Sequence, residues 1–302
     1  MAKDKEGYFK RAVVTIDRNT CNDCGLCAEI CGGQPLVMVN GKVEVDPKSA
    51  LGCFACGQCM IVCPTGSVSV RGRNLSPKDI IELQPRTTRA TTDQLETLLT
   101  QRRSTRRFKP KDVDRGIVDR VIQIASTAPM GTPPSEVGIL VVHGPEKVKS
   151  FSDDVMTTIG RTMDKINPVT LALFRPFMKK TDYQGFKEFV IPIADLMVKD
   201  KESGGDPLLY GAPVALLFHS SPYADPADCV IAATYAMIAA ESIGLGTCMI
   251  GMVAPFLERD EKLKAKYGIP KSNKPGIVLI MGYPATNFKR GIRRRFASVT
   301  YS

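Results

Sequence analysis

The sequence lacks any apolar run long enough to cross a membrane. Its longest apolar stretches are residues 212–218 and 277–281, whereas a spanning helix needs about 20 apolar residues. The opening MAKDKEGYFKR also lacks the apolar core of a secretory signal. We therefore expect a cytoplasmic protein that does not have a membrane partner.

Histidine is scarce, and two common nucleotide-binding motifs are missing. The two histidines, His143 and His219, each end a predicted strand and have no carboxylate neighbours at ligand spacing. This pattern argues against a histidine metal site. Neither G-x-G-x-x-G after a strand nor G-x-x-x-x-G-K-[ST] occurs, so neither a Rossmann site nor a P-loop is predicted.

Cysteine, by contrast, is abundant and concentrated. Eight of the ten cysteines lie within residues 21–63, in two C-x2-C-x2-C-x3-C runs that begin 32 residues apart. Disulfides are disfavoured because cytosolic thiols stay reduced. Zinc, which is satisfied by four ligands in C-x-x-C pairs, remains an alternative. Three thiolates on one tight loop and a distant fourth thiolate favour a four-iron cubane cluster.

In the bacterial two-cluster pattern, the fourth cysteine of each run binds the other cluster. One predicted 4Fe–4S cluster therefore takes Cys21, Cys24, Cys27 and Cys63, and the other takes Cys53, Cys56, Cys59 and Cys31. Gly25 and Gly57 follow the second cysteine of each run, where the backbone must bend closely around inorganic sulfide.

Residues 12–70 resemble a bacterial 2×(4Fe–4S) ferredoxin. The chain departs from that pattern at Gly32-Gly33, which follow Cys31 where the ferredoxins have proline. The two halves are also separated by a hairpin-like insert with a predicted turn at Asn40-Gly41.

The rest of the chain alternates predicted helices and strands. Residues 71–92 are polar and basic and read as a connection. Helices are expected from residue 92 or 93 into the basic run at 102, and at 113–126, 145–163, 226–243 and 255–266; strands are expected at 137–143, 212–219 and 276–282. The stretch 164–205 reads as an irregular insertion or lid. This alternation predicts an α/β or α+β fold with a helix-covered sheet.

Two basic clusters flank this region. RRSTRRF covers residues 102–108, and the second cluster holds Lys289, Arg290, Arg293, Arg294 and Arg295. Either cluster alone reads as a solvated basic face. Together they suit a terminal phosphate, which favours a hydroxyl among bidentate guanidinium donors.

Residues 93–300 are similar to the nitroreductase family of FMN-dependent oxidoreductases. The matching pieces occur in the family's order: RRSTRRF, APMGTPPS, GAPVALLF, AAESIGLGTCMIG, and MGYPA before the arginine tail. The resemblance implies an α+β, nitroreductase-like, helix-covered sheet with a small N-terminal two-cluster ferredoxin-like domain. The expected domains are 1–72 (ferredoxin-like), 73–92 (linker) and 93–302 (FMN domain).

The resemblance also implies a set of FMN contacts. Arg102, Arg103, Ser104 and Arg106 would bind the phosphate and ribityl end, with Arg290 and Arg293 or Arg294 closing from the C-terminal side. Pro129, Met130, Gly131 and Ser135 would lie along the flavin ring, and Met249, Ile250 and Gly251 would contact the region near flavin N5. Many members carry Asn and Gln-Pro in the proline-rich loop, where this chain has Pro133, Ser135 and Glu136. Backbone groups or Ser135 must substitute.

Three further residues on apolar segments have no role in the proposed cofactor sites. Glu241 lies on an apolar helix face and is either a buried functional acid or the partner of an arginine. Cys229 and Cys248 sit alone on apolar segments, where small buried packing is the expected role. No protein acid or base is assigned, because the substrate proton can come from water.

The predicted function is an FMN-dependent reductase in which two clusters relay single electrons to FMN for hydride reduction of a nitroaromatic, quinone or activated alkene. A ferredoxin or flavodoxin-type donor is expected, and a homodimer is implied by the resemblance. The alternatives are an enzyme reduced by NAD(P)H, with the clusters as outlet, and a non-catalytic electron carrier or redox sensor. The net charge of +10 would fall to about +4 with clusters and FMN bound, which argues against a nucleic-acid partner.

Overall fold

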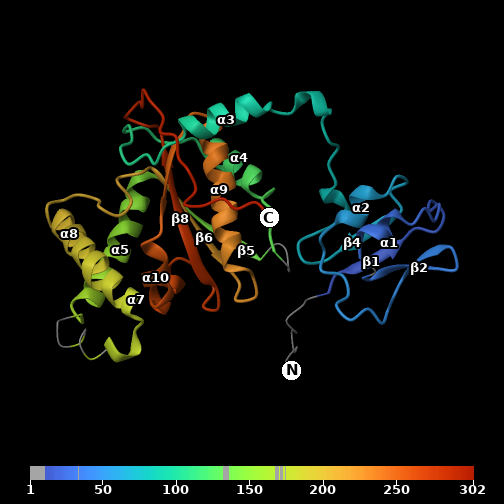
Figure 1. The fold of residues 1–302 in the computed structure, drawn as a ribbon, viewed down its shortest axis with the longest axis horizontal. Helices are drawn as coiled ribbons and strands as arrows, with labels where there is room; N and C mark the ends of the chain where they lie inside the picture. Colours follow the sequence, from blue (N-terminus) through green and yellow to red (C-terminus); the bar gives the residue numbers. More distant parts are fainter. Residues whose placement is uncertain (1–10, 33, 132–135, 167–169, 171–172, 174) are drawn as a thin grey trace. The chain divides into compact units, whose positions relative to one another are not determined.

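The structure is a computed structural model that describes residues 11–32, 34–131, 136–166, 170, 173 and 175–302. The chain forms two compact units (Figure 1). Unit 1 comprises Met1–Arg89, Met130–Glu136 and Tyr223–Asp225, and unit 2 comprises Ala90–Pro129, Val137–Pro222 and Pro226–Ser302. Among the described residues, no helix is both long enough and apolar enough to span a bilayer.

Unit 1 is built from two small antiparallel strand pairs and two one-turn helices. Strand β1 (Val13–Ile16) pairs with β4 (Val68–Arg71), and β2 (Leu36–Val39) pairs with β3 (Lys42–Val45). The helices are α1 (Leu26–Ile30) and α2 (Gln58–Val62), and the short 3₁₀ turns η1 (Pro77–Asp79) and η2 (Arg86–Thr88) follow. The predicted hairpin turn is confirmed, because Asn40 and Gly41 connect β2 and β3 with φ of 48° and 78°, as a type I′ turn requires.

The cysteine loops of unit 1 depend on two glycines. Gly25 precedes α1 with φ of 81° and Gly57 precedes α2 with φ of 76°. Both angles lie in the left-handed region, which glycine adopts without steric cost. Each turn directs its helix inward, so that the third cysteine of each run, Cys27 or Cys59, joins the small apolar core of the unit.

Unit 2 contains an antiparallel four-stranded sheet in the order β5-β6-β8-β7. Its strands are β5 (Val137–His143), β6 (Val214–Ser220), β7 (Gly246–Ile250) and β8 (Lys274–Gly282). The three strands predicted in this part of the chain are confirmed, and each of their ends lies within two residues of the predicted one. Strand β7 was not predicted, because GTCMI is short and follows a glycine-rich turn that hides its alternation.

Helices cover both faces of this sheet (Figure 1). One face carries α5 (Pro145–Met163), α10 (Val253–Glu258) and α11 (Glu261–Lys266), with α8 (Ile191–Glu202) packed on α5. The other face carries α9 (Pro226–Ser242), against which α3 (Thr92–Gln101) and α4 (Arg115–Ala125) pack. Leu217 joins the core beneath α5, while its fully buried neighbour Leu216 points the opposite way, toward α9.

Two predicted elements are corrected. Residues 164–205 are not irregular throughout: they include η3 (Arg175–Phe177), α7 (Lys180–Gly185), the π-helical segment η4 (Phe186–Val190) and α8. Pro192 lies in the first turn of α8, directly after the π-helical segment η4. The single helix expected at 255–266 is two helices, since Asp260 caps α11 by accepting the N–H of Leu263.

Candidate functional site

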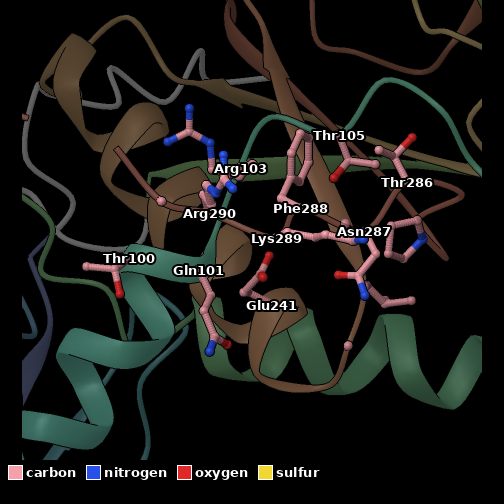
Figure 2. Close-up of a pocket in the computed structure, with 15 residues that line it drawn as sticks. Thr100, Gln101, Arg103, Thr105, Glu241, Thr286, Asn287, Phe288, Lys289 and Arg290 are labelled. Atoms are coloured by element: carbon pink, nitrogen blue, oxygen red, sulfur yellow. The ribbon is translucent and has the colours of Figure 1, made fainter. Parts of the chain in front are cut away.

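A polar cavity of about 490 Å³ lies in unit 2, where α3 ends, α9 turns into β7 and the segment after β8 passes (Figure 2). Three cationic side chains line it: Arg103, Lys289 and Arg290. Uncharged donors from the segments around the end of α3 and after β8 accompany them, namely Thr100, Gln101, Thr105, Thr286 and Asn287. A cavity with this lining suits an anion that also carries hydroxyl or carbonyl groups.

Backbone hydrogen bonds hold the residues after α3 against β7. Thr105 N–H donates to the carbonyl of Thr247 at 2.8 Å, and Ser104 bridges the same residue. Gly246 makes this approach possible, because a Cβ there would lie only 2.7 Å from the Cβ of Thr105. Strand β7, which was not predicted from the sequence, therefore holds the segment that carries Arg103 in place.

The C-terminal side of the cavity is held in the same way. Ala285 N–H donates to the carbonyl of Arg107 at 2.9 Å, and Lys109 N–H donates to the carbonyl of Tyr283 at 2.8 Å. These bonds join the segment after β8 to the segment after α3. These bonds explain how Arg103 and Arg290, which are far apart in the sequence, line one cavity.

A buried hydroxyl group beside the cavity lacks a partner. Thr247 is fully buried, and its Oγ1 forms no hydrogen bond within the part of the chain that the structure describes. Leaving such a group unpaired costs about 1–3 kcal/mol. Its neighbours Thr105 and Gly246 both line the cavity, so a bound polar molecule has an unused partner close by.

Among the residues that the structure describes, Glu241 is the one carboxylate in the cavity lining. Figure 2 shows its side chain directed into the space that Arg103 and Arg290 also border. Burial raises the pKa of Glu241, and the nearby charge of Arg102 opposes that rise only in part. Both sequence readings thus apply to some degree, because Glu241 is half-buried in the site and also feels an arginine.

Several residues implied by the resemblance lie outside this cavity lining. Arg106 places its guanidinium 5.8 Å from the ring centre of Tyr210, and Ser104, Arg293 and Arg294 are exposed. Met249 is half-buried and Ile250 is buried in β7, and the exposed Gly251 follows. Their contacts with a flavin stay predictions.

The proline-rich loop divides between the two units. Pro129 is exposed in unit 2, whereas Met130 and Gly131 belong to unit 1. Ser135 and Pro133 lie outside the described residues. Glu136 forms an ion pair with the buried guanidinium of Arg73, also in unit 1. The placement of this loop along a flavin therefore stays a prediction.

The cysteines of unit 1 gather in two groups. Burial raises the pKa of Cys27, and the charges of Cys63 and Cys21 add to that rise. Burial likewise raises the pKa of Cys59 to about 12, and the charges of Cys53, Cys56 and Cys31 contribute to that rise. The second group lines a cavity of about 290 Å³. In each group one cysteine comes from the other run, Cys63 in the first and Cys31 in the second, which agrees with the crossed pattern.

The two cysteine groups differ from a site for a single metal ion. Among the described residues, no three His, Cys, Asp or Glu side chains are spaced to hold one metal ion. Thiolates around a cubane each bind a different iron, so they lie farther apart than the ligands of one ion. N–H groups already point at sulfur: Ser67 donates to Cys63 at 3.3 Å and Ala55 donates to Cys53 at 3.4 Å. Such bonds favour the thiolate form that metals bind.

Comparisons with known proteins follow this geometry. A family model described as the nitroreductase family matches residues 99–283. The FMN-bound nitroreductase structure from Bacteroides fragilis NCTC 9343 is 16% identical, with a TM-score of 0.54 over 70% of this chain and 100% of that chain. The FMN-bound nitroreductase from Desulfitobacterium hafniense DCB-2 is 19% identical, with a TM-score of 0.50 over 69% of this chain and 97% of that one.

A search of curated proteins found no match. The solved structures share the fold of unit 2, and the matched span begins after the cysteine runs. That span covers more than half of the 302 residues. With its α+β fold and its family match, this chain belongs to the nitroreductase family of oxidoreductases.

Proposed function

We propose that the chain is an FMN-dependent reductase that receives single electrons through two 4Fe–4S clusters and reduces a small organic acceptor. The observation that carries this proposal is the cavity shared by Arg103 and Arg290. The two residues come from segments that the resemblance assigns to the FMN phosphate, and two FMN-bound structures share the fold. We infer that the cavity holds the phosphate end of FMN.

The residues of the cavity fit that role chemically. Arg103 and Arg290 would hold the phosphate with charge-assisted hydrogen bonds, which are roughly twice as strong as neutral ones. Gln101, Thr105 and Asn287 would orient the hydroxyl-bearing chain of the cofactor. Bound FMN would supply the capacity to take up electrons singly and deliver two to an organic acceptor.

The cysteines of unit 1 fit two clusters. Cys21, Cys24, Cys27 and Cys63 would hold one cluster, and Cys53, Cys56, Cys59 and Cys31 would hold the other. Bound clusters would supply one-electron transfer over a range of potentials set by their surroundings. The N–H donors at Cys63 and Cys53 would stabilise the sulfur charge and so adjust those potentials.

Three further expectations belong to this proposal. The domain boundaries 1–72, 73–92 and 93–302 stay predictions, as does the homodimer implied by the resemblance, which sedimentation would test. Nitroaromatics, quinones and activated alkenes are the proposed acceptors. A ferredoxin or flavodoxin-type donor is the proposed source of electrons, and NAD(P)H acting at the flavin is the competing source.

Anaerobic purification followed by cofactor quantification tests the proposal. We expect about eight iron, eight sulfide and one FMN per chain. Arg103→Ala and Arg290→Ala should each weaken FMN binding about 10- to 100-fold, because each removes a charged hydrogen bond worth about 1.5–3 kcal/mol. Arg120→Ala, an exposed arginine on α4, is the matched control and should bind FMN normally. A chain that holds iron but no flavin after reconstitution would contradict the reductase.

A second arm addresses the direction of electron flow. Cys56→Ala should retain FMN and lose flavin reduction by chemically reduced ferredoxin, measured by the bleaching of the flavin absorbance. Unchanged reduction by ferredoxin would contradict the relay. If NAD(P)H rapidly bleached the flavin of both the native chain and Cys56→Ala, the alternative in which the clusters are the electron outlet would be favoured.

A further inference from the structure

A second cavity in unit 2 has a composition that the proposed reductase does not use. It has a volume of about 620 Å³ and lies between the end of α5, the junction of α10 and α11, and the segment that includes η4. This is the face of the sheet covered by α5, whereas the first cavity lies at α3, α9 and β7. A ligand bound here would therefore not contact Arg103 or Arg290.

The charged part of the cavity is strongly cationic. Arg161, Lys165 and Arg259 line it, and Asp260 is the one carboxylate among the described residues of the lining. Among the described residues, none of the three cations forms an ion pair. Like charges that share a cavity repel one another, so an anion bound among them would be stabilised.

Asp260 is not available to neutralise these cations fully. Its Oδ1 accepts the N–H of Leu263 at 2.9 Å, and its Oδ2 accepts the hydroxyl of Thr158 at 2.8 Å. The backbone N–H of Leu263, then the Thr158 hydroxyl and the charge of Arg161, lower the pKa of Asp260. The carboxylate thus acts mainly as the cap of α11 and leaves an excess of positive charge in the cavity.

The cavity lining also includes apolar side chains. Ile166, Met178 and Phe186 line it, and each is half-buried. Phe186 also begins the π-helical segment η4, and π-helical turns within helices occur frequently at functional sites. A methionine and an aromatic ring together adapt to the shape of an apolar ligand.

We propose that this cavity is a second binding site, selective for an organic anion that carries an apolar group. The cations would bind a phosphate or carboxylate, and the apolar side chains would cover the rest of the molecule. Such a ligand matches the cavity in both charge and polarity, and 620 Å³ lies within the usual range for small-molecule sites. The inference does not depend on flavin binding.

Calorimetric titration of the full, cofactor-loaded chain with phenyl phosphate tests this site. FMN is kept at saturation so that the first cavity is blocked, and released flavin is monitored. We expect binding that Arg161→Ala and Arg259→Ala each weaken about tenfold, with Arg161→Lys partly restoring it. Arg120→Ala, outside both cavities, should bind as the native chain does. Inorganic phosphate and phenol should each bind at least about tenfold more weakly than phenyl phosphate.

Three outcomes would overturn the proposal. These are no binding of phenyl phosphate, an equal loss in Arg120→Ala, or inorganic phosphate binding as tightly as phenyl phosphate. If an arginine variant does not fold by circular dichroism, Lys165→Gln, at an exposed position, replaces it with the same expected loss. If the chain holds no FMN, the titration is repeated with Arg103→Ala, which should leave phenyl phosphate binding unchanged and so separates this site from the proposed flavin site.

Discussion

Glu241 places a negative charge in a cavity that we propose to hold a phosphate. Burial raises its pKa, so the folded chain binds a proton at this residue more tightly than the unfolded chain does. The stabilising effect of that proton is complete below the unfolded pKa and is lost as the pH rises through the folded pKa. Above that range the carboxylate is charged, half-buried and repels an incoming anion.

Glu241→Gln should therefore bind FMN more tightly than the native chain at pH 8. We expect about a three- to tenfold gain, because one negative charge near the phosphate is removed. The gain should shrink as the pH is lowered toward the raised pKa of Glu241, where the native side chain becomes protonated. Quenching of FMN fluorescence across this pH range measures both affinities. Weaker binding by the Gln variant at pH 8 would mean that the carboxylate instead orients Arg102.

Gly246 is a residue whose missing side chain matters more than its conformation. An added Cβ would meet the Cβ of Thr105 at 2.7 Å and push residues 103–105 away from β7. Gly246→Ala should lower stability by about 1–3 kcal/mol, the usual cost of overpacking, and should weaken FMN binding. Gly160→Ala is the control, because it lies in α5 with nothing within 4 Å and should stabilise by about 0.5–1 kcal/mol. Equal thermal shifts in the two variants would contradict this reading.

At the scale of elements, α3 presents the first arginines of the proposed site, and its start is well defined. Thr91 accepts the N–H of Gln94 at 3.2 Å, and Gln94 accepts the N–H of Thr91 at 2.9 Å. This capping box satisfies two N–H groups that a helix start otherwise leaves unpaired. All residues of α3 are at least partly exposed, so packing contributes little and the cap contributes proportionately more.

Thr91→Ala should destabilise α3 locally by about 1 kcal/mol. Hydrogen exchange of the amides in Thr92–Gln101 should then speed up about fivefold, while exchange in α9 stays unchanged. Thr91→Ser keeps the hydroxyl and should behave like the native chain. Faster exchange throughout unit 2 would show that the cap stabilises the whole unit instead.

Elements with a local signal were predictable from the sequence. The Asn40-Gly41 turn, the capped start of α4 at Asp114 and the long α5 all show their periodicity or turn chemistry within a few residues. Strand β7 was not predictable in this way, because its order comes from pairing with β8 and from Thr105 across a long sequence separation. The helices within 164–205 were missed because this stretch was interpreted as an irregular insertion ending in KDKESGGD.

At the scale of the whole molecule, the proposed sites show the same contrast between local sequence signals and long-range contacts. The proposed cysteine ligands could be named from the sequence, because their spacing is local and chemically specific. The proposed flavin residues Arg103 and Arg290 could be named only through the resemblance, since they meet through the tertiary fold. Glu241 was singled out as a possible acid, yet no sequence pattern tied it to the arginines. The second cationic cavity had no sequence signal, because its residues lie on separate helices.

The two units differ in how they are stabilised, and this difference predicts two unfolding transitions. The core of unit 2 contains large buried side chains such as Phe151, Leu217 and Leu257. The core of unit 1 consists mainly of small residues and the inner cysteines, with Leu36 as its largest fully buried side chain. So small a core is marginal without metal, and binding of metal to cysteines contributes directly to folding.

Iron chelation should therefore abolish the unfolding transition of unit 1 or strongly lower its temperature. Anaerobic calorimetry before and after chelation measures this change. The transition of unit 2 should move by less than about 2 °C, because its core contains none of the eight ligands. Removing FMN is the converse control: at a free concentration of 100 times the Kd, its loss costs about 2.7 kcal/mol and should lower only the transition of unit 2. If chelation lowered both transitions equally, the cysteine clusters would be stabilising the chain as one cooperative unit.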